Sequence, residues 1–218
     1  MISERHASWL AFAVLAVFGA ATGSWRDARE PTTIALPGAA DWFWLRANLA
    51  WEKRDEARTR ELTTLAVALA PATDYFRVNA ARMRAFDFPE WRERAEPAAP
   101  AALKASWRAE LAAESLALLE RAPARSPELW IEAGNIALYA RRDSREAAAC
   151  YRRAAEMPGA PWHAGRICGE LLWRSGQRRE AVDWLRDWGG RLPADVPAAQ
   201  RELVLARLAE WERELRRE

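Results

Sequence analysis

Apolar residues recur three and four positions apart along most of the chain after residue 40, which is the spacing that gathers them on one face of an α-helix. The first such stripe carries Trp44, Asn48 and Trp51, with Asp41 as its candidate N-cap. The later stripes predict helices over 56–70, 73–86, 103–121, 127–141, 144–156, 161–174, 178–188 and 198–216. The sequence therefore predicts an all-α protein of about four helical hairpins followed by a closing helix.

Prolines mark the connections between these helices. Pro71, Pro123 and Pro158 each follow the second helix of a predicted hairpin. Residues 87–102, DFPEWRERAEPAAPAA, contain three prolines and are predicted to form the one long connection. A loop of that length is either functional or a plain spacer, and both interpretations stay open. The final helix carries dense charge, which suits a polar cap on the end of a stack of helices.

The amino-terminal part has a different pattern. Nineteen uncharged residues run from Ala7 to Trp25, and as a helix they would span about 28 Å, close to the hydrocarbon thickness of a bilayer. Trp9 and Trp25 stand at its two ends, where interfacial aromatic residues belong. We expect an uncleaved transmembrane anchor. A signal peptide cleaved before Thr22 and a buried core helix remain the alternatives.

Three segments follow from these patterns: a signal-anchor helix over 1–25, a linker over 26–40 and a helical domain over 41–218. An amino-terminal start signal with no later span usually leaves the bulk of the chain translocated. We therefore expect a single-pass protein of an inner membrane with its helical domain in the periplasm, or a secreted domain if the segment is cleaved.

Composition narrows the classes of function. The 33 basic and 31 acidic residues nearly cancel, which argues against a nucleic-acid binder. Cys150 and Cys168 are the only cysteines and there are two histidines, so the sequence predicts neither a disulfide framework nor a four-ligand zinc site. We expect the two cysteines to be buried free thiols, with a bridge between them as the alternative. No cofactor and no metal site are predicted.

Two segments resemble a known repeat. The stretch 129–158, LWIEAGNIALYARRDSREAAACYRRAAEMP, resembles the tetratricopeptide repeat, and the stretch 162–192 is similar to it at an interval of 34 residues. The residues that carry the resemblance are Trp130, Gly134, Ala147, Tyr151, Ala154 and Pro158, then Gly169, Gly176, Ala181 and Leu185. Trp188 departs from it, because a small alanine is usual there, and the turn at 143–145 is one residue longer. The resemblance implies a right-handed α-solenoid whose concave face holds another polypeptide.

A column of polar residues recurs in the first helix of each predicted hairpin. Aligning these helices places Asn48, Asn79 and Asn135 in one column, followed by Glu170. In proteins with this repeat that position faces the groove, and an Asn there can hold a peptide backbone through its donor and its acceptor. Alternatively, the column is a ladder that satisfies the backbones of neighbouring helices.

Aromatic and arginine residues lie within a turn of this column, as at many protein interfaces. Trp44 and Tyr75 lie one turn before it, whereas Trp107, Trp130, Trp184 and Trp188 are assigned to the core. The complete set of predicted partner-binding residues is Asn48, Trp51, Asn79, Arg82, Asn135, Tyr139, Arg166, Glu170 and Trp173.

Catalytic motifs are not apparent. The sequence has no Gly-rich phosphate loop, nucleophile elbow or HExxH motif. Glu110, Glu114 and Glu146 are expected to be solvated, with support from charges one turn away, and His163 is expected to be solvated too. The predicted function is a non-enzymatic, membrane-anchored scaffold that binds a protein or peptide partner and no nucleic acid. A structural subunit with Trp-rich permanent interfaces, and a regulatory domain of an envelope enzyme or transport machine, are the alternatives.

Overall fold

The computed structural model describes residues 37–123 and 126–217, and within these ranges the chain is helical with no strand. The all-α prediction is confirmed there. In the same ranges, no helix is both long and apolar enough to cross a bilayer. The predicted anchor, residues 7–25, and most of the predicted linker lie outside the described ranges.

The elements follow the predicted stripes closely. Along the chain they are α2 Pro37–Glu52, α3 Glu56–Leu69, α4 Asp74–Arg82, η1 Met83–Asp87, α5 Phe88–Ala95, α6 Ala101–Glu120, α7 Pro127–Asn135, η2 Ile136–Ala140, α8 Ser144–Ala155, α9 His163–Arg174, α10 Arg178–Arg191, η3 Pro197–Ala199 and α11 Arg201–Leu215. The elements η1 and η2 are π-helical turns, and η3 is a short 3-10 helix.

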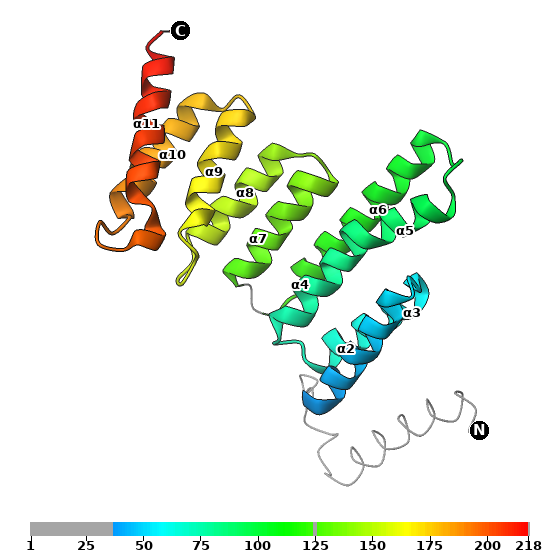
Figure 1. Cartoon of the computed structure of the whole chain (residues 1–218). Helices are drawn as coiled ribbons and strands as arrows, with labels where there is room; N and C mark the ends of the chain where they lie inside the picture. The colour runs from blue at the N-terminus through cyan, green and yellow to red at the C-terminus, as the bar shows by residue number, and fades with distance from the viewer. Residues whose placement is uncertain (1–36, 124–125, 218) are drawn as a thin grey trace, which may run out of the picture. The chain divides into compact units, whose positions relative to one another are not determined.

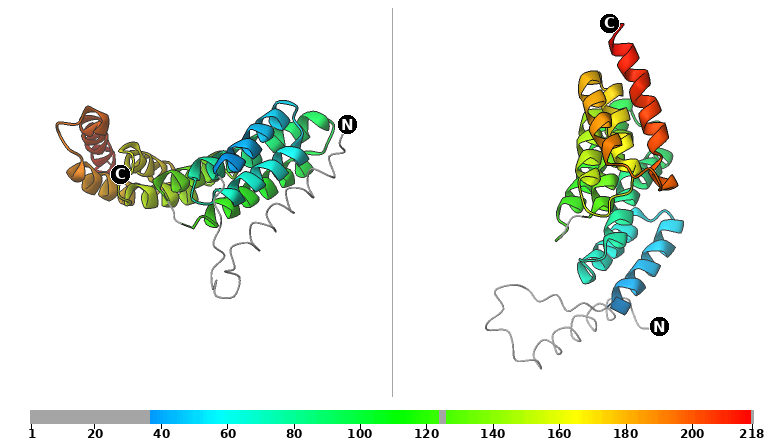
Figure 2. Two further views of the ribbon diagram at one scale, coloured as in Figure 1. Left: turned by 90° about the horizontal axis from the view of Figure 1, so that it is seen from below. Right: turned by 90° about the vertical axis from the view of Figure 1, so that its left-hand side faces the viewer.

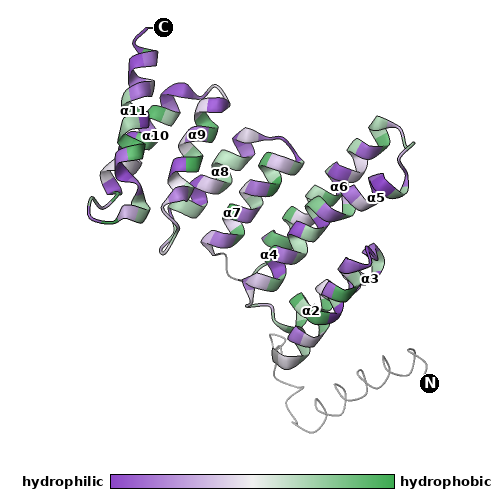
Figure 3. Cartoon of the chain, in the orientation of Figure 1, coloured by the Kyte–Doolittle hydropathy of each residue, from purple (hydrophilic) through white to green (hydrophobic). Residues whose placement is uncertain are grey.

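Helices that are neighbours in the sequence pack against each other. The pairs α2/α3, α7/α8 and α9/α10 are in contact, and α4 packs on α6, so the four predicted hairpins are present (Figure 1). Contacts between α8 and α9 and between α10 and α11 link the later pairs in chain order, and Figure 2 shows this succession from two further directions. Hydrophobic and hydrophilic positions alternate along these helices, as expected where each helix buries one side (Figure 3).

The predicted long connection over 87–102 is wrong. The helix that starts at Asp74 continues through η1 into α5 and ends at Ala95, so only residues 96–100 connect it to α6. A proline inside an α-helix clashes with the carbonyl four residues earlier. Here Phe88 donates its backbone N–H to the carbonyl of Met83, five residues back, and this wider turn comes directly before Pro89. The π turn allows the helix to pass through the proline.

The first helix begins earlier than predicted. It starts at Pro37, four residues before Asp41, and so includes the last four residues of the predicted linker. Proline suits the first turn of a helix, where its missing N–H has no acceptor to lose. The added turn also brings Ala40 into the core, where it is buried. Trp44, predicted to lie near the binding face, is buried as well and packs on Phe76, with ring centroids 5.3 Å apart.

The core of α7–α10 depends on close approach of helices at glycines. A Cβ at Gly134 would lie 2.8 Å from the ring of Tyr151, and one at Gly165 would overlap the indole of Trp188. Trp184 and Trp188 are buried and stacked with centroids 6.0 Å apart, so their assignment to the core is confirmed. The two other tryptophans assigned to the core, 107 and 130, are only half-buried. Both cysteines are buried and neither takes part in a disulfide, as expected.

Candidate protein-interaction surface

Two short stripes of predicted partner-binding residues lie next to each other. On α4, Asn79 and Arg82 continue a stripe that begins with the exposed Tyr75, and on α7 and η2, Asn135 and Tyr139 are one turn apart. Contacts between α4 and α7 and between η1 and η2 bring the two stripes together. We call these five residues the α4/α7 surface.

A buried carboxylate fixes the centre of the α4/α7 surface. Glu132 is 1% exposed, and its Oε2 atom accepts a hydrogen bond from Arg82 Nε at 2.8 Å and one from Asn135 Nδ2 at 3.2 Å. Arg82 Nη2 also lies 2.7 Å from this oxygen. The hydrogen bond that Arg82 donates to Glu132 raises the pKa of Arg82, and burial opposes this shift. Arg82 therefore stays charged and is held in place while about half of its side chain faces solvent.

Tyr151 of α8 completes this cluster from the other side. Its hydroxyl donates to Asn135 Oδ1 at 2.6 Å, and burial together with the nearby Tyr139 and Glu132 raises the pKa of Tyr151 to about 12. Asn135 thus donates one N–H to Glu132 and accepts one hydrogen bond from Tyr151. An Asn side chain has two N–H groups and two lone pairs, so one of each remains for a ligand.

The other two asparagines of the predicted column have different surroundings. Asn79 Nδ2 donates to the carbonyl of Tyr75 in its own helix at 2.8 Å. Asn48 is half-buried, and no hydrogen bond joins its side chain to another residue of the described ranges. Neither Asn79 nor Asn135 bonds the backbone of a neighbouring helix, so the ladder interpretation does not describe their contacts.

A depression of about 260 Å³ lies at one end of the α4/α7 surface. Both π turns line it, η1 through Ala85 and Phe86 and η2 through Tyr139 and Ala140, and π turns in helices are frequently found at functional sites. Tyr139 is 68% exposed. The remaining lining residues are Pro89, Glu90, Glu93, Arg108 and Arg142. An aromatic wall beside charges of both signs suits a polypeptide segment with mixed side chains.

Glu170 and Trp173 are occupied by the chain itself. Arg207 of α11 lies 3.1 Å from Glu170, and Trp211 of α11 stacks on Trp173 with ring centroids 4.5 Å apart and planes 3° from parallel. Arg178 lies over the same ring of Trp173 at 5.1 Å. These two predicted residues therefore hold the last helix of the described ranges.

Trp51 and Arg166 lie apart from the α4/α7 surface. Trp51 donates from Nε1 to Asp87 of η1 at 2.8 Å and so connects the end of α2 to the π turn. Burial raises the pKa of Asp87, and the hydrogen bond from Trp51 opposes this effect. Arg166 is half-buried, and its Nε makes no hydrogen bond to a described residue. The nine predicted residues thus form several groups rather than one continuous site.

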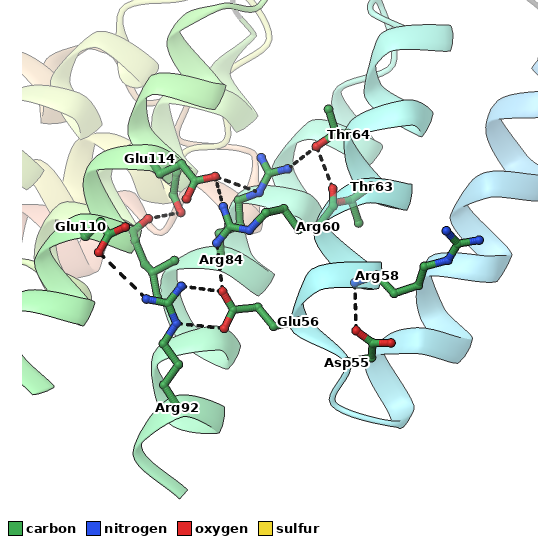
Figure 4. A network of polar contacts seen from close by, with 12 residues as sticks. Asp55, Glu56, Arg58, Arg60, Thr63, Thr64, Arg84, Arg92, Glu110 and Glu114 are labelled. Atoms are coloured by element: carbon green, nitrogen blue, oxygen red, sulfur yellow. Dashed lines mark hydrogen bonds and ion pairs between the residues drawn. The ribbon is translucent and has the colours of Figure 1, made fainter. Parts of the chain in front are cut away.

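Sequence reasoning missed a network of charges between α3, η1, α5 and α6 (Figure 4). Glu114 was expected to be solvated with support from its own helix, but it pairs with Arg60 of α3 and lies 3.7 Å from Arg84 of η1. Burial lowers the pKa of Arg84, and the charge of Glu114 opposes this shift. Arg84 follows the buried Ala80 and Ala81 by one turn, and this register was the available signal that it points inward.

Glu110 and Glu146, which were also expected to be solvated, differ less from that expectation than Glu114 does. Glu110 is 68% exposed and lies 4.0 Å from Arg92 of α5. Glu146 pairs with Arg141 at 2.7 Å, and its backbone N–H bonds the N-cap Asp143. Among the described residues, no group of three or more His, Cys, Asp or Glu side chains could hold a metal ion.

A scan against protein-family models finds none that matches the chain, and a search of curated proteins finds no similar sequence.

Proposed function

We propose that this protein is a non-enzymatic, membrane-anchored scaffold that binds a helical or extended segment of a partner protein on its α4/α7 surface. In this proposal the four helix pairs form a right-handed solenoid of the tetratricopeptide type, closed by α11. Residues 7–25 anchor the chain in an inner membrane, with the helical domain on the periplasmic side. The recurrence of residues at an interval of 34 and the packing of α11 on Glu170 and Trp173 support this proposal.

The observation that carries the proposal is the packing of α11 on Glu170 and Trp173. These two residues come from the column and the adjacent turn that the sequence assigned to partner binding. They hold a helix through one ion pair and one pair of stacked rings. On the earlier helices, Arg82 occupies the position of Trp173, and Tyr139 lies one residue beyond the corresponding Leu138. The α4/α7 surface thus also offers one charged and one aromatic side chain. A partner helix with an acidic and an aromatic residue one turn apart would fit them.

The α4/α7 surface is suited to binding because its central groups are already fixed. Glu132 and Tyr151 hold Arg82 and Asn135 in place, so little side-chain entropy remains to be lost on association. Tyr75 and Tyr139 are 59% and 68% exposed, and aromatic residues carry much of the binding energy at interfaces.

Site-specific photo-crosslinking in native membranes tests this function. A photoreactive amino acid at Glu90, beside the depression, should crosslink to a discrete partner. Tyr139→Ala should weaken that crosslink about five- to tenfold, as truncation of an aromatic anchor does, whereas Tyr139→Phe should retain it. A probe at Leu203 on α11 is the matched exposed control. Equal crosslinking at both sites, or no effect of Tyr139→Ala, would reject the α4/α7 surface as the binding site.

A structural subunit is the second candidate, because Trp42, Trp51 and Trp162 are exposed. Light scattering of the full chain in detergent separates the two functions. A stable oligomer that resists dilution favours the subunit, and a monomer favours the scaffold.

A further inference from the structure

Helix α2 is apolar on two opposite sides. Its inner side packs on α3 through alanines and the buried Trp44. On its outer side Trp42, Leu45 and Leu49 are 54%, 64% and 51% exposed. Their spacing of three and four residues places all three on one stripe along the helix.

An exposed apolar stripe is unusual on a helix whose opposite side already packs on other helices. The solvent side of a packed helix normally carries charged and polar residues, and a helix that is apolar all round is normally covered on every side. On α11 the exposed Leu203 has no large exposed apolar neighbour on its helix, so it needs no partner. On α2 three large side chains form a contiguous patch, which marks an interaction site.

The composition of this patch fits a lipid surface. Tryptophan is enriched where membranes meet water, and leucine enters the boundary between headgroups and acyl chains. Arg46 lies at the edge of the patch, with its guanidinium carbon 5.7 Å from the centroid of the Trp42 ring. In that position it can contact anionic headgroups while the ring lies at the interface.

The place of α2 in the chain favours the same occupant. Eleven residues, 26–36, lie between the apolar segment 7–25 and Pro37. Eleven fully extended residues reach at most about 40 Å. If residues 7–25 cross a bilayer, the start of α2 cannot leave the neighbourhood of that bilayer, and its effective concentration at the surface is high.

We propose that the outer face of α2 lies on the phospholipid surface, with Trp42, Leu45 and Leu49 inserted at the headgroup boundary. This inference rests on the proposed membrane anchor. The contact gives the helical domain a defined orientation on the membrane instead of a free tether. It also makes α2 the base from which the remaining helices extend.

A fluorophore on the full chain tests the contact. The chain carries an environment-sensitive dye at Leu45→Cys and is reconstituted in vesicles of phosphatidylethanolamine and phosphatidylglycerol. The matched control carries the dye at Leu203→Cys, which is exposed to a similar degree, and the native cysteines are buried. We expect iodide to quench the dye at position 45 several-fold less than at 203, and brominated lipid to quench only the dye at 45. Adding Leu49→Lys should raise the iodide quenching of the dye at position 45 toward the value at position 203.

Each other outcome overturns the inference. Equal iodide quenching at 45 and 203 means that the face is in water. Protection at 45 from both iodide and brominated lipid means that protein covers it, either a second copy of the chain or residues 7–25. Alkaline carbonate extraction reports on the anchor separately. Release of the chain from the vesicles would remove the anchor proposal, whereas retention with an iodide-accessible position 45 would remove only the α2 contact.

Discussion

The helix pairs on either side of residue 125 are held together by different chemistry. Around α3, η1, α5 and α6, charged side chains make many of the contacts between helices, beside small apolar clusters. Glu56 accepts hydrogen bonds from Arg92 at 2.9 and 2.7 Å and from Arg60 at 3.1 Å, and Glu114 bridges Arg60 and Arg84 (Figure 4). Around α8, α9 and α10, small residues allow large rings to interlock.

The later region has the larger apolar core. A single large cluster of buried residues extends from Ala137 to Trp211, whereas the clusters of the first two pairs are smaller. One of these smaller clusters continues from Ala81 and Leu119 to Leu129 and Ile136 of the third pair. Partly exposed ion pairs contribute little net stability, because desolvation and side-chain ordering offset the attraction. Close apolar packing contributes in proportion to the area that it removes from water. We therefore expect the later region to be sensitive to volume, and the earlier region to charge, pH and salt.

The largest effect should come from Gly165→Ala in the later region. The added methyl group would overlap the ring of Trp188, a buried ring that cannot move without disturbing α10. We expect a loss of about 3 kcal/mol in the free energy of unfolding, measured by chemical denaturation of the full chain in detergent. Gly190→Ala is the matched control, because a Cβ there meets no atom within 4 Å. It should change stability by less than about 1 kcal/mol. Equal effects at both glycines would contradict the close packing.

In the earlier region, the corresponding test is Glu114→Gln. This change keeps the shape of the side chain but removes the negative charge that faces Arg60 and the buried Arg84. We expect a loss of about 1–2 kcal/mol, because Arg84 then remains buried without an opposing charge.

Glu110→Gln, one turn earlier on the same helix, is the control for Glu114→Gln. Glu110 is 68% exposed, so its loss should cost less than about 0.5 kcal/mol in the same denaturation experiment. If the two variants are equally stable, Glu114 is not a structural charge.

The same difference explains what the sequence could predict. In the later region, Gly134 and Gly169 stand opposite large side chains at helical spacing, and the interior is visible as a pattern of small and large apolar residues. The helix ranges and the pairing of the helices could therefore be predicted from the sequence. In the earlier region, Glu114 has the spacing of an ordinary solvated helix residue, and nothing in its spacing shows that its partners lie on other helices.

Two further features could not be predicted from the sequence, each because of a property of a single helix. Pro89 predicts a helix end, and only the π turn before it allows the helix to continue, a backbone feature without a reliable sequence signal. On α2, apolar residues occupy both sides, so the stripe of Trp44 and the stripe of Leu45 could not be distinguished by periodicity. Within the candidate site, the column of asparagines was readable, whereas the link from Arg82 to the buried Glu132 required the packing of α4 on α7.

A smaller effect should appear in alkali, and only in the later region. Burial raises the pKa of the Cys168 thiol from 9.0 to about 12, with the nearby Arg152 opposing and Glu180 and Glu156 adding to the shift. Because the folded pKa lies above that of a free thiol, this contribution to stability is complete below pH 9 and is lost as the pH rises toward 12.

The variant Cys168→Ala removes this titration. Between neutral pH and about pH 10.5, the wild type should lose on the order of 1 kcal/mol more than the variant in denaturation experiments. Tyr151, whose pKa is also raised to about 12, contributes equally to both proteins and cancels in the difference. Identical pH profiles would show that the Cys168 thiol is open to water.

The smallest effect should appear in acid, and in the earlier region. Burial alone would raise the pKa of Glu56, but hydrogen bonds and charges from Arg92 and Arg60 outweigh it, so the pKa lies below its usual 4.5. The stabilising contribution of Glu56 is therefore present above pH 4.5 and is lost as the pH falls through the lowered value. The raised pKa of Asp87 acts in the opposite direction, because a group whose folded pKa is raised adds stability as acid protonates it.

Because the two carboxylates oppose each other, the acid profile of the wild type alone is ambiguous, and Glu56→Gln separates them. At neutral pH the variant should be less stable than the wild type by less than about 1 kcal/mol, since the ion pairs are partly exposed. That gap should close at a pH below the lowered pKa of Glu56, and it should shrink at neutral pH in about 1 M salt, which screens exposed charges. A gap that persists in both acid and salt would mean that Glu56 acts through packing, and the contrast between a charge-linked and an apolar region would no longer hold.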